Sequence, residues 1–279
     1  MDSDELGLLE HENLIAAMAL ICGCVDGALI RRQDGVALIA TGLPLRLFNQ
    51  VIVESAEASP AALEAAVEAT RRRGDRFVVN LRVKSDDRFL PLVDGLGLTR
   101  LSEDPWMPGM ALHPIPAEPM PAEPMPAEPM PAAPPGHEIR PVTDAPGIED
   151  HIVTAAAGFG LPEDIVRKVV GLDLVGRPDV TFYVGYTDGQ PVSSGLGVRT
   201  GRTMGVYNIA TVAGARKRGY GAAMTARIAA DGARAGCHVA TLQASEMGRL
   251  IYERLGYRTV VEYMGYVDPA PIQGGSPSG

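Results

Sequence analysis

The chain has 279 residues, of which 46% are hydrophobic and 21% are charged. This composition is typical of a soluble globular protein and excludes a disordered chain, and the length suits two ordinary domains. The formal net charge of −9 argues against a nucleic-acid-binding protein, because phosphate backbones attract basic surfaces, and it favours a cationic substrate.

The first predicted element is a core helix in the apolar run of residues 14–25, which lies between Glu12 and Asp26. The run is too short to span a membrane and has no basic segment before it, so we predict neither a membrane anchor nor a signal peptide. The three cysteines, at positions 22, 24 and 237, lack the spacing of disulfides or metal ligands, which favours a reducing cytoplasm.

The pentapeptide PAEPM occurs three times in succession in residues 116–130. Proline at this density removes backbone donors and fixes φ, so that neither a helix nor a central strand can form. We therefore predict a linker at residues 114–136 between a first domain, residues 1–113, and a second domain, residues 137–268. A semi-rigid spacer is favoured over a docking motif, and the Pro-, Gly- and Ser-rich residues 269–279 are predicted to be a disordered tail.

The second domain shows an alternation of strands and helices that predicts a mixed α/β sheet flanked by helices. The predicted elements are strand 137–141, helix 144–157, a short helix after Pro162, strands 180–186 and 191–198, strand 203–212, helix 222–235, strand 238–244 and a short helix containing residues 250–254.

Residues 216–222, RKRGYGA, connect a predicted strand to an alanine-rich predicted helix. Glycine lets the backbone approach a ligand closely, and the first N–H groups of the helix then point at that ligand. The helix dipole and the side chains of Arg216, Lys217 and Arg218 add positive charge. The pattern predicts a phosphate-binding loop; the alternative is an ordinary glycine turn with a solvated basic surface.

The motif Arg-x-x-Gly-x-Gly-Ala at residues 216–222 is followed by a predicted strand and then by Leu-Ile-Tyr-Glu-Arg-Leu-Gly-Tyr at residues 250–257. In this order and at this distance, the two motifs closely resemble those of the GCN5-related N-acetyltransferases over roughly residues 137–267. The resemblance implies the acyl-CoA N-acyltransferase fold, acetyl-CoA as co-substrate, and direct transfer of an acetyl group to a primary amine in a ternary complex.

The resemblance also implies a set of site residues. Those implied to bind acetyl-CoA are Ile209, Ala210, Thr211, Val212, Arg216, Lys217, Arg218, Gly219, Tyr220, Gly221, Ala222 and Ser245. The strand residues would pair with the pantetheine arm, and a backbone N–H near Thr211 or Val212 would stabilise the oxyanion. Ser245 stands where many family members have asparagine. Tyr252 matches the tyrosine that protonates the departing thiolate, its alternative role being packing on the sheet.

A general base is not evident. Members of the family often have Glu or Asp on the strand that corresponds to residues 203–212, but here this strand has no carboxylate and contains Tyr207 and Asn208 instead. The alternatives are a water held by Asn208, a substrate that arrives neutral, Glu246, or a carboxylate from elsewhere in the chain. The histidines show no ligand spacing and no partnered serine or cysteine, so no metal site and no nucleophilic catalysis are predicted.

The first half contains a weak repeat of the second. Residues 48–51 (FNQV) resemble residues 207–210 (YNIA), and residues 92–98 (LVDGLGL) resemble residues 251–257 (IYERLGY), both at an offset of 159 positions. With this offset EASPAAL, residues 57–63, replaces the glycine loop, Ser59-Pro60 forms an ordinary helix start, and Val93 replaces Tyr252. We therefore predict a tandem protein with a degenerate first domain and a single acetyl-CoA site.

Together these patterns predict a cytoplasmic, acetyl-CoA-dependent N-acetyltransferase whose acceptor is a small-molecule or peptide amine. The alternative is a non-catalytic CoA-binding or protein-interaction module that has kept the cofactor loop. No nucleic acid and no membrane is expected as a partner, and a homodimer is compatible with the interpretation. The scarcity of lysine among the basic residues and the abundance of alanine and glycine fit a GC-rich bacterial genome.

Overall fold

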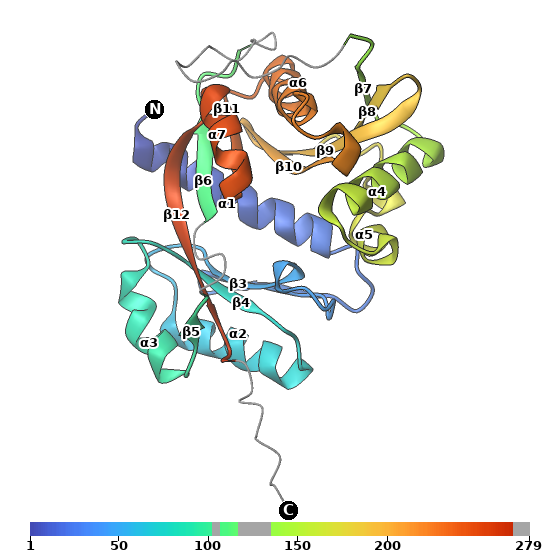
Figure 1. Cartoon of the computed structure of the whole chain (residues 1–279). Helices are drawn as coiled ribbons and strands as arrows, with labels where there is room; N and C mark the ends of the chain where they lie inside the picture. The colour runs from blue at the N-terminus through green and yellow to red at the C-terminus, as the bar shows by residue number, and fades with distance from the viewer. Residues whose placement is uncertain (102–106, 117–134, 270–279) are drawn as a thin grey trace, which may run out of the picture.

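The computed structural model describes residues 1–101, 107–116 and 135–269. The PAEPM repeats and nearly all of the predicted tail lie outside the described residues. Within the described ranges the chain forms seven α-helices and one mixed sheet of twelve strands (Figure 1). The α-helices are α1 Ser3–Cys22, α2 Pro60–Arg73, α3 Leu90–Gly95, α4 Ala145–Phe159, α5 Glu163–Val169, α6 Tyr220–Arg234 and α7 Glu246–Arg254.

Most of the longer helices begin where the sequence offers a side-chain cap. Asp2, Ser59, Asp144 and Ser245 each accept a hydrogen bond from a backbone N–H in the first turn of α1, α2, α4 and α7, respectively. α6 begins at Tyr220, two residues earlier than predicted, because Gly219 adopts a left-handed conformation directly before it. None of the helices in the described part of the chain is long and apolar enough to cross a membrane.

The strands are β1 Leu29–Gln33, β2 Val36–Ala40, β3 Asn49–Val53, β4 Val78–Arg82, β5 Thr99–Arg100, β6 Met107–Leu112, β7 Glu138–Pro141, β8 Val180–Thr187, β9 Gln190–Thr200, β10 Thr203–Thr211, β11 Val239–Gln243 and β12 Arg258–Val267. The five strands predicted for the second half are confirmed as β7 to β11, whereas β12 was not predicted. Their order in the sheet is β1-β2-β3-β4-β12-β6-β11-β10-β9-β8-β7, and β5 pairs with β12. In each half, antiparallel strands lead to one parallel pair, β3 with β4 and β10 with β11.

The two halves exchange their last strands. β6, which the predicted boundary assigns to the first half, lies between β11 and β12 of the second half. β12 in turn pairs with β6 through its first residues, and with β4 and β5 of the first half through its last residues. The sheet is therefore continuous through both halves (Figure 1). The domain boundaries themselves stay a prediction.

Helix α1 lies between the two halves, and it confirms the predicted core helix as far as Cys22 (Figure 1). Its buried face belongs to the same core cluster as Ile39 and Ile52 of the first half and Phe182 of the second. Burying one such aliphatic or aromatic side chain contributes about 1.5–3 kcal/mol, so α1 binds the halves to each other by its apolar face. Separate clusters lie under α2 and α3 and under α6.

The predicted repeat of the two halves rests on two sequence matches, and the structure supports one of them. Gly97 and Gly256, 159 positions apart, both have positive φ values, 71° and 89°, directly after α3 and α7. The match of Asn49 with Asn208 is wrong in structural terms. Asn49 comes just before the residues of β3 that pair with β4, whereas Asn208 comes after Gly205, the last residue of β10 that pairs with β11. The longer β10 shifts the register of the two strands.

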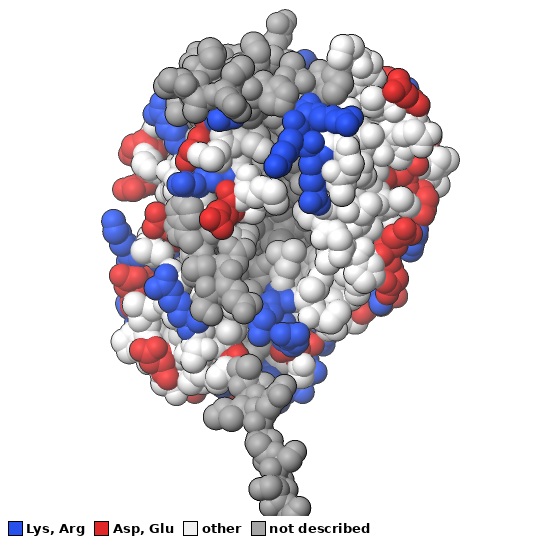
Figure 2. All heavy atoms as spheres, in the orientation of Figure 1, with Lys and Arg blue, Asp and Glu red and all other residues white. Residues whose placement is uncertain are grey.

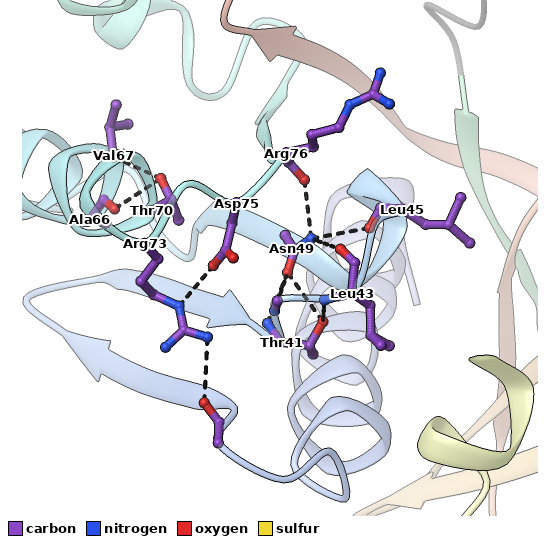
Figure 3. A network of polar contacts seen from close by, with 12 residues as sticks. Thr41, Leu43, Leu45, Asn49, Ala66, Val67, Thr70, Arg73, Asp75 and Arg76 are labelled. Atoms are coloured by element: carbon purple, nitrogen blue, oxygen red, sulfur yellow. Dashed lines mark hydrogen bonds and ion pairs between the residues drawn. The ribbon is translucent and has the colours of Figure 1, made fainter. Parts of the chain in front are cut away.

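Asn49 has a local structural role (Figure 3). Its Oδ1 accepts hydrogen bonds from the backbone N–H groups of Thr41 and Gly42, at 2.8 and 3.1 Å. Its Nδ2 donates to the carbonyls of Leu43 and Arg76, at 2.8 and 3.1 Å. The side chain thus joins the β2–β3 loop to the segment before β4. Because Asn208 is not its structural equivalent, this role does not carry over to Asn208.

Candidate active site

The parallel strands β10 and β11 separate part of the way along their length. Thr203–Gly205 pair with Val239–Thr241, and beyond these residues the two strands are no longer paired. β10 continues to Thr211 through a bulge at Asn208, whose φ is 52° and where the register with β9 shifts. A bulge bends a strand and increases its twist. We call the space between the diverging ends of β10 and β11 the split.

The direction of the β10 amides distinguishes the two predicted oxyanion donors. The Val212 N–H donates to the carbonyl of Val192 at 3.0 Å, on the β9 side of the strand. Successive N–H groups of a strand point to opposite sides, so the Thr211 N–H is directed to the side of the split. Of the two predicted donors, Thr211 has the geometry that a ligand in the split requires.

The first turn of α6 faces the end of β10. No side chain among the described residues caps this helix, and Gly219, at its N-cap, has φ of 84°. A Cβ atom added to Gly221 would lie 3.6 Å from Ile209 Cγ2 and 3.7 Å from Thr211 Oγ1, so a large side chain there would be directed at the end of β10. The uncapped N–H groups at the start of a helix can bind an anion such as phosphate.

Arg216 makes contacts that the sequence did not indicate. Its Nη2 donates to the carbonyl of Gly158 at 2.6 Å, and its Nε donates to the carbonyl of Thr211 at 3.3 Å. Gly158 lies in the last turn of α4, where a cation also interacts favourably with the helix dipole. A Cβ atom on Gly158 would lie 2.7 Å from Ala210 Cβ, so glycine permits this close packing. Arg216 therefore holds α4 against the end of β10.

Lys217 and Arg218 are exposed beside Arg216, and Lys217 has a φ of 62°. Tyr220 is buried against His137, with ring centroids 4.6 Å apart in an edge arrangement. Ala222, in the first turn of α6, is also buried. The structure thus brings residues 216–222 together with residues 209–212 at one end of the split. Their roles in binding acetyl-CoA stay predictions.

Tyr252 lies half-buried on α7, and its ring and that of Tyr257 form an edge arrangement with centroids 6.2 Å apart. Burial raises the pKa of its hydroxyl to about 12, so the group is protonated at neutral pH, as a general acid must be. A Cβ atom on Gly248 would lie 2.8 Å from the Tyr252 ring, so glycine leaves room for it. The acid role of Tyr252 stays a prediction.

Ser245 caps α7, because its Oγ accepts a hydrogen bond from Gly248 N at 3.2 Å. The hydroxyl hydrogen is left to donate elsewhere, so the predicted contact with the cofactor is compatible with the cap. Glu246, one of the alternatives for the general base, is exposed at the start of the same helix.

The sequence interpretation missed a buried carboxylate, Glu10 of α1, which lies against Gln243 at the end of β11. A signal for it was present in the chain. Glu10 is one helical turn from Leu14, on the face of α1 that is buried, and a carboxylate on a buried face requires partners.

The surface near α4 and α5 is acidic. Figure 2 shows acidic side chains along the edge of the molecule where Figure 1 places these two helices, and the exposed carboxylates there include Glu163 and Asp164, whereas Glu149 is paired with Arg167. Such a surface attracts cations, including protonated amines.

No family model and no curated protein matches the sequence. Solved structures do match. A GCN5-related N-acetyltransferase from Kribbella flavida matches with a TM-score of 0.65 and 18% identity, covering 91% of this chain and 95% of the other. A tandem GNAT protein from the clavulanic acid biosynthesis pathway matches with a TM-score of 0.57 and 14% identity, covering 94% and 96%.

A third match, a GCN5-related N-acetyltransferase from Sphaerobacter thermophilus, has a TM-score of 0.56 and 17% identity and covers 87% of this chain and 82% of the other. At these identities the likeness concerns the fold. It extends over both halves of the chain, in agreement with the paired strand orders described above. The protein thus has the fold of the GCN5-related N-acetyltransferases, in its tandem form.

Proposed function

We propose that the protein is an acetyl-CoA-dependent N-acetyltransferase that moves an acetyl group to a primary amine by direct attack in a ternary complex. The observation that carries the proposal is the start of α6, where uncapped N–H groups follow a left-handed glycine beside the end of β10, and where Arg216 contacts the carbonyl of Thr211. The resemblance of residues 216–222 and 250–257 to the acetyltransferase motifs supports it.

In this proposal the first turn of α6 binds the phosphate groups of acetyl-CoA, whose thioester supplies the activated acetyl group. The Thr211 N–H stabilises negative charge on the carbonyl oxygen while the amine attacks. Tyr252 gives its proton to the departing sulfur. The acidic surface over α4 and α5 favours a cationic amine that loses a proton before it reacts.

The test is a panel of small-molecule and peptide amines incubated with acetyl-CoA, with the release of CoA thiol followed over time. We expect saturable release with one or more amines, and calorimetry should show one acetyl-CoA per chain. Absence of acetyl-CoA binding, or binding at two sites, would contradict the proposal.

The second candidate is a non-catalytic CoA-binding or protein-interaction module. It is favoured by the sequence of β10, which has no carboxylate at the positions where family members often place the base. Acetyl-CoA binding of normal affinity, without acetylation of any amine in the panel, would select this alternative.

A further inference from the structure

Asn13 of helix α1 lies over the last residue pair that joins β10 to β11. This pair is Gly205 of β10 and Thr241 of β11. A Cβ atom added to Gly205 would lie 1.9 Å from Asn13 Oδ1, so only glycine leaves room there, and the Thr241 hydroxyl donates to the same oxygen at 3.4 Å. A residue of the first half thus contacts the sheet of the second half at the point where the split begins.

The Asn13 amide connects three neighbouring strands. Asn13 has no exposed surface, and its Nδ2 donates to the carbonyl of Val198 at 3.1 Å and to Thr200 Oγ1 at 2.8 Å, both on β9. Because a carbonyl can only accept, the amide nitrogen must face β9, and Oδ1 must face the other two strands. The Tyr207 hydroxyl of β10 donates to this oxygen at 2.5 Å. Asn13 therefore holds β9 and β10 beside the last residue pair of β10 and β11.

Tyr207 is the β10 residue directly before the bulge at Asn208. A Cβ atom added to Gly205 would lie 2.4 Å from Tyr207 Cε2, so the tyrosine ring lies back over Gly205. The ring is buried on the face of the sheet that α1 covers, where its hydroxyl reaches Asn13. Helix α1 thus holds β10 immediately before the strand changes its course.

The bulge decides which way the rest of β10 faces. On either side of it Tyr207 pairs with Leu196 of β9 and Ala210 pairs with Ser194, so β10 has one residue more than β9 between these two pairs. Side chains and N–H groups alternate along a strand, so an extra residue reverses the direction of those that follow, relative to a regular strand. The place of the bulge therefore determines that the Thr211 N–H is directed to the split.

The bulge requires contacts that hold it in place. Asn208 has a φ of 52°, in the left-handed region that residues other than glycine rarely adopt unless the surrounding structure enforces it. Pairing with β11 has ended at Gly205, so β9 and α1 remain to provide this constraint. Asn13 joins the two, because its amide bonds to β9 on one side and to Tyr207 on the other.

We propose that Asn13 is a positioning residue for acetyl transfer: through Tyr207 it fixes the place of the bulge in β10 and, with it, the direction of the Thr211 N–H. This inference rests on the proposed acetyltransferase function, in which Thr211 stabilises negative charge on the thioester oxygen. Asn13 acts through β10 and not by touching acetyl-CoA or the amine. The first half, whose own helix start is capped, thereby has a role in the reaction of the second half.

The first test removes the hydrogen bond between β10 and Asn13. Tyr207→Phe keeps the ring over Gly205 and leaves the start of α6 unchanged, so the variant should fold and bind acetyl-CoA within about twofold of the parent. A displacement of about 1 Å at a reacting centre can cost on the order of 10²-fold in rate. With an amine that the parent acetylates, we expect kcat to fall by roughly 10- to 10²-fold and KM for the amine to stay within about twofold.

Tyr183→Phe is the matched control. The Tyr183 hydroxyl, on β8, donates to Asp231 of α6 at 3.1 Å, so this variant removes the same group from another buried tyrosine of the same sheet. Both variants should lower Tm by similar amounts, and only Tyr207→Phe should lower kcat. A Tyr207→Phe protein with the parent's kcat, or equal losses of kcat in the two variants, would overturn the inference, since the hydroxyl would then contribute stability alone.

A double-mutant cycle tests whether Tyr207 acts through Asn13. Asn13→Ala removes the acceptor of the hydrogen bond, so adding Tyr207→Phe to it should lower kcat by less than about twofold further. Losses that multiply in the double variant would mean that Tyr207 acts independently of Asn13 and would overturn the inference. Should Asn13→Ala not fold, the comparison of Tyr207→Phe with Tyr183→Phe decides by itself.

A final measurement follows Thr211 without turnover. In NMR spectra of the isotope-labelled parent, the Thr211 amide proton should move downfield when acetyl-CoA is added, because this N–H donates to the thioester carbonyl. The movement should be reduced in Tyr207→Phe and retained in Tyr183→Phe; an equal movement in both variants would overturn the inference. If Thr211 behaves as expected but the parent acetylates no amine, the acetyltransferase function fails and the positioning of Thr211 by Asn13 stands.

Discussion

The strand order β1-β2-β3-β4 of the first half corresponds to β8-β9-β10-β11 of the second, but the helices that follow β3 and β10 begin differently. In the first half, Ser59 accepts a hydrogen bond from Ala62 N and Pro60 occupies the first turn of α2, so the helix start is closed by its own residues. In the second half, Gly219 precedes α6 without a side-chain cap from any described residue. One helix start is satisfied locally, and the other is available to an anion.

The strands that precede these helices also differ, in how far each extends beyond its pairing with the neighbouring parallel strand. β3 ends at Val53, one residue after the last residue that pairs with β4. β10 continues well past its pairing with β11, and the split opens there. The capped helix therefore occurs with a closed strand pair, and the uncapped helix occurs with an open one. The first half therefore lacks both the uncapped helix start and the split that occur together in the second half.

The largest expected effect concerns Tyr252, whose counterpart in the first half is Val93. Tyr252→Phe keeps the ring and its contact with Tyr257, so stability and acetyl-CoA affinity should change little. Loss of a general acid should lower kcat by about 10²- to 10⁴-fold. Stopped-flow or steady-state CoA release measures the effect.

Tyr257→Phe is the matched control, because the Tyr257 hydroxyl is buried and has no hydrogen-bond partner among the described residues. It should leave kcat unchanged. If Tyr252→Phe also turns over at the parent rate with acetyl-CoA, Tyr252 is a packing residue and not the acid.

The next effect concerns the cofactor loop. Gly221→Trp should direct its side chain at Ile209 and Thr211 and lower acetyl-CoA affinity by at least about 10²-fold, a loss of about 2.7 kcal/mol. Ala61→Trp makes the same type of change in the first turn of α2, where the side chain is exposed, and should leave one site per chain. Calorimetry on both variants measures the result. Loss of binding in Ala61→Trp would place a ligand in the first half and break the comparison.

A smaller effect is expected at Arg216. Arg216→Ala should weaken acetyl-CoA binding by roughly 10-fold, because one charge-assisted hydrogen bond contributes about 1.5–3 kcal/mol at most at a solvated site. Arg216→Lys keeps the charge and should restore most of the affinity if the contact is with phosphate. An equal loss of affinity in both variants would instead mean that Arg216 acts through its hydrogen bonds to the carbonyls of Gly158 and Thr211. The single ammonium group of lysine cannot make both bonds in the same geometry.

The smallest effect distinguishes two caps. Ser59→Ala and Ser245→Ala each remove a side-chain acceptor at a helix start and should each lower the free energy of unfolding by about 1 kcal/mol. Only Ser245→Ala should also weaken acetyl-CoA binding. Thermal unfolding with and without acetyl-CoA provides both values, and an equal ligand-induced shift in the two variants would mean that Ser245 is a cap alone.

Much of this molecule followed from its local sequence. Ser59-Pro60 predicted the start of α2, and residues 216–222 predicted a loop between a strand and a helix, because caps, proline and glycine act through backbone torsions and hydrogen bonds a few residues apart. The repeat at Gly97 and Gly256 was also readable, since both residues end a helix in a left-handed conformation.

The tertiary structure alone decided three features: the exchange of β6 and β12, the contact of Arg216 with α4, and the position of Glu10. Glu10 contacts Tyr263, which is 253 positions away in the chain, and Arg216 contacts Gly158 at a separation of 58. No short-range pattern specifies such partners, because strands of similar composition can pair in several orders and packing selects one of them. For that reason the sequence predicted a loop between β10 and α6, whereas the burial of Glu10 against Gln243 and Tyr263 became visible only when both halves were folded together.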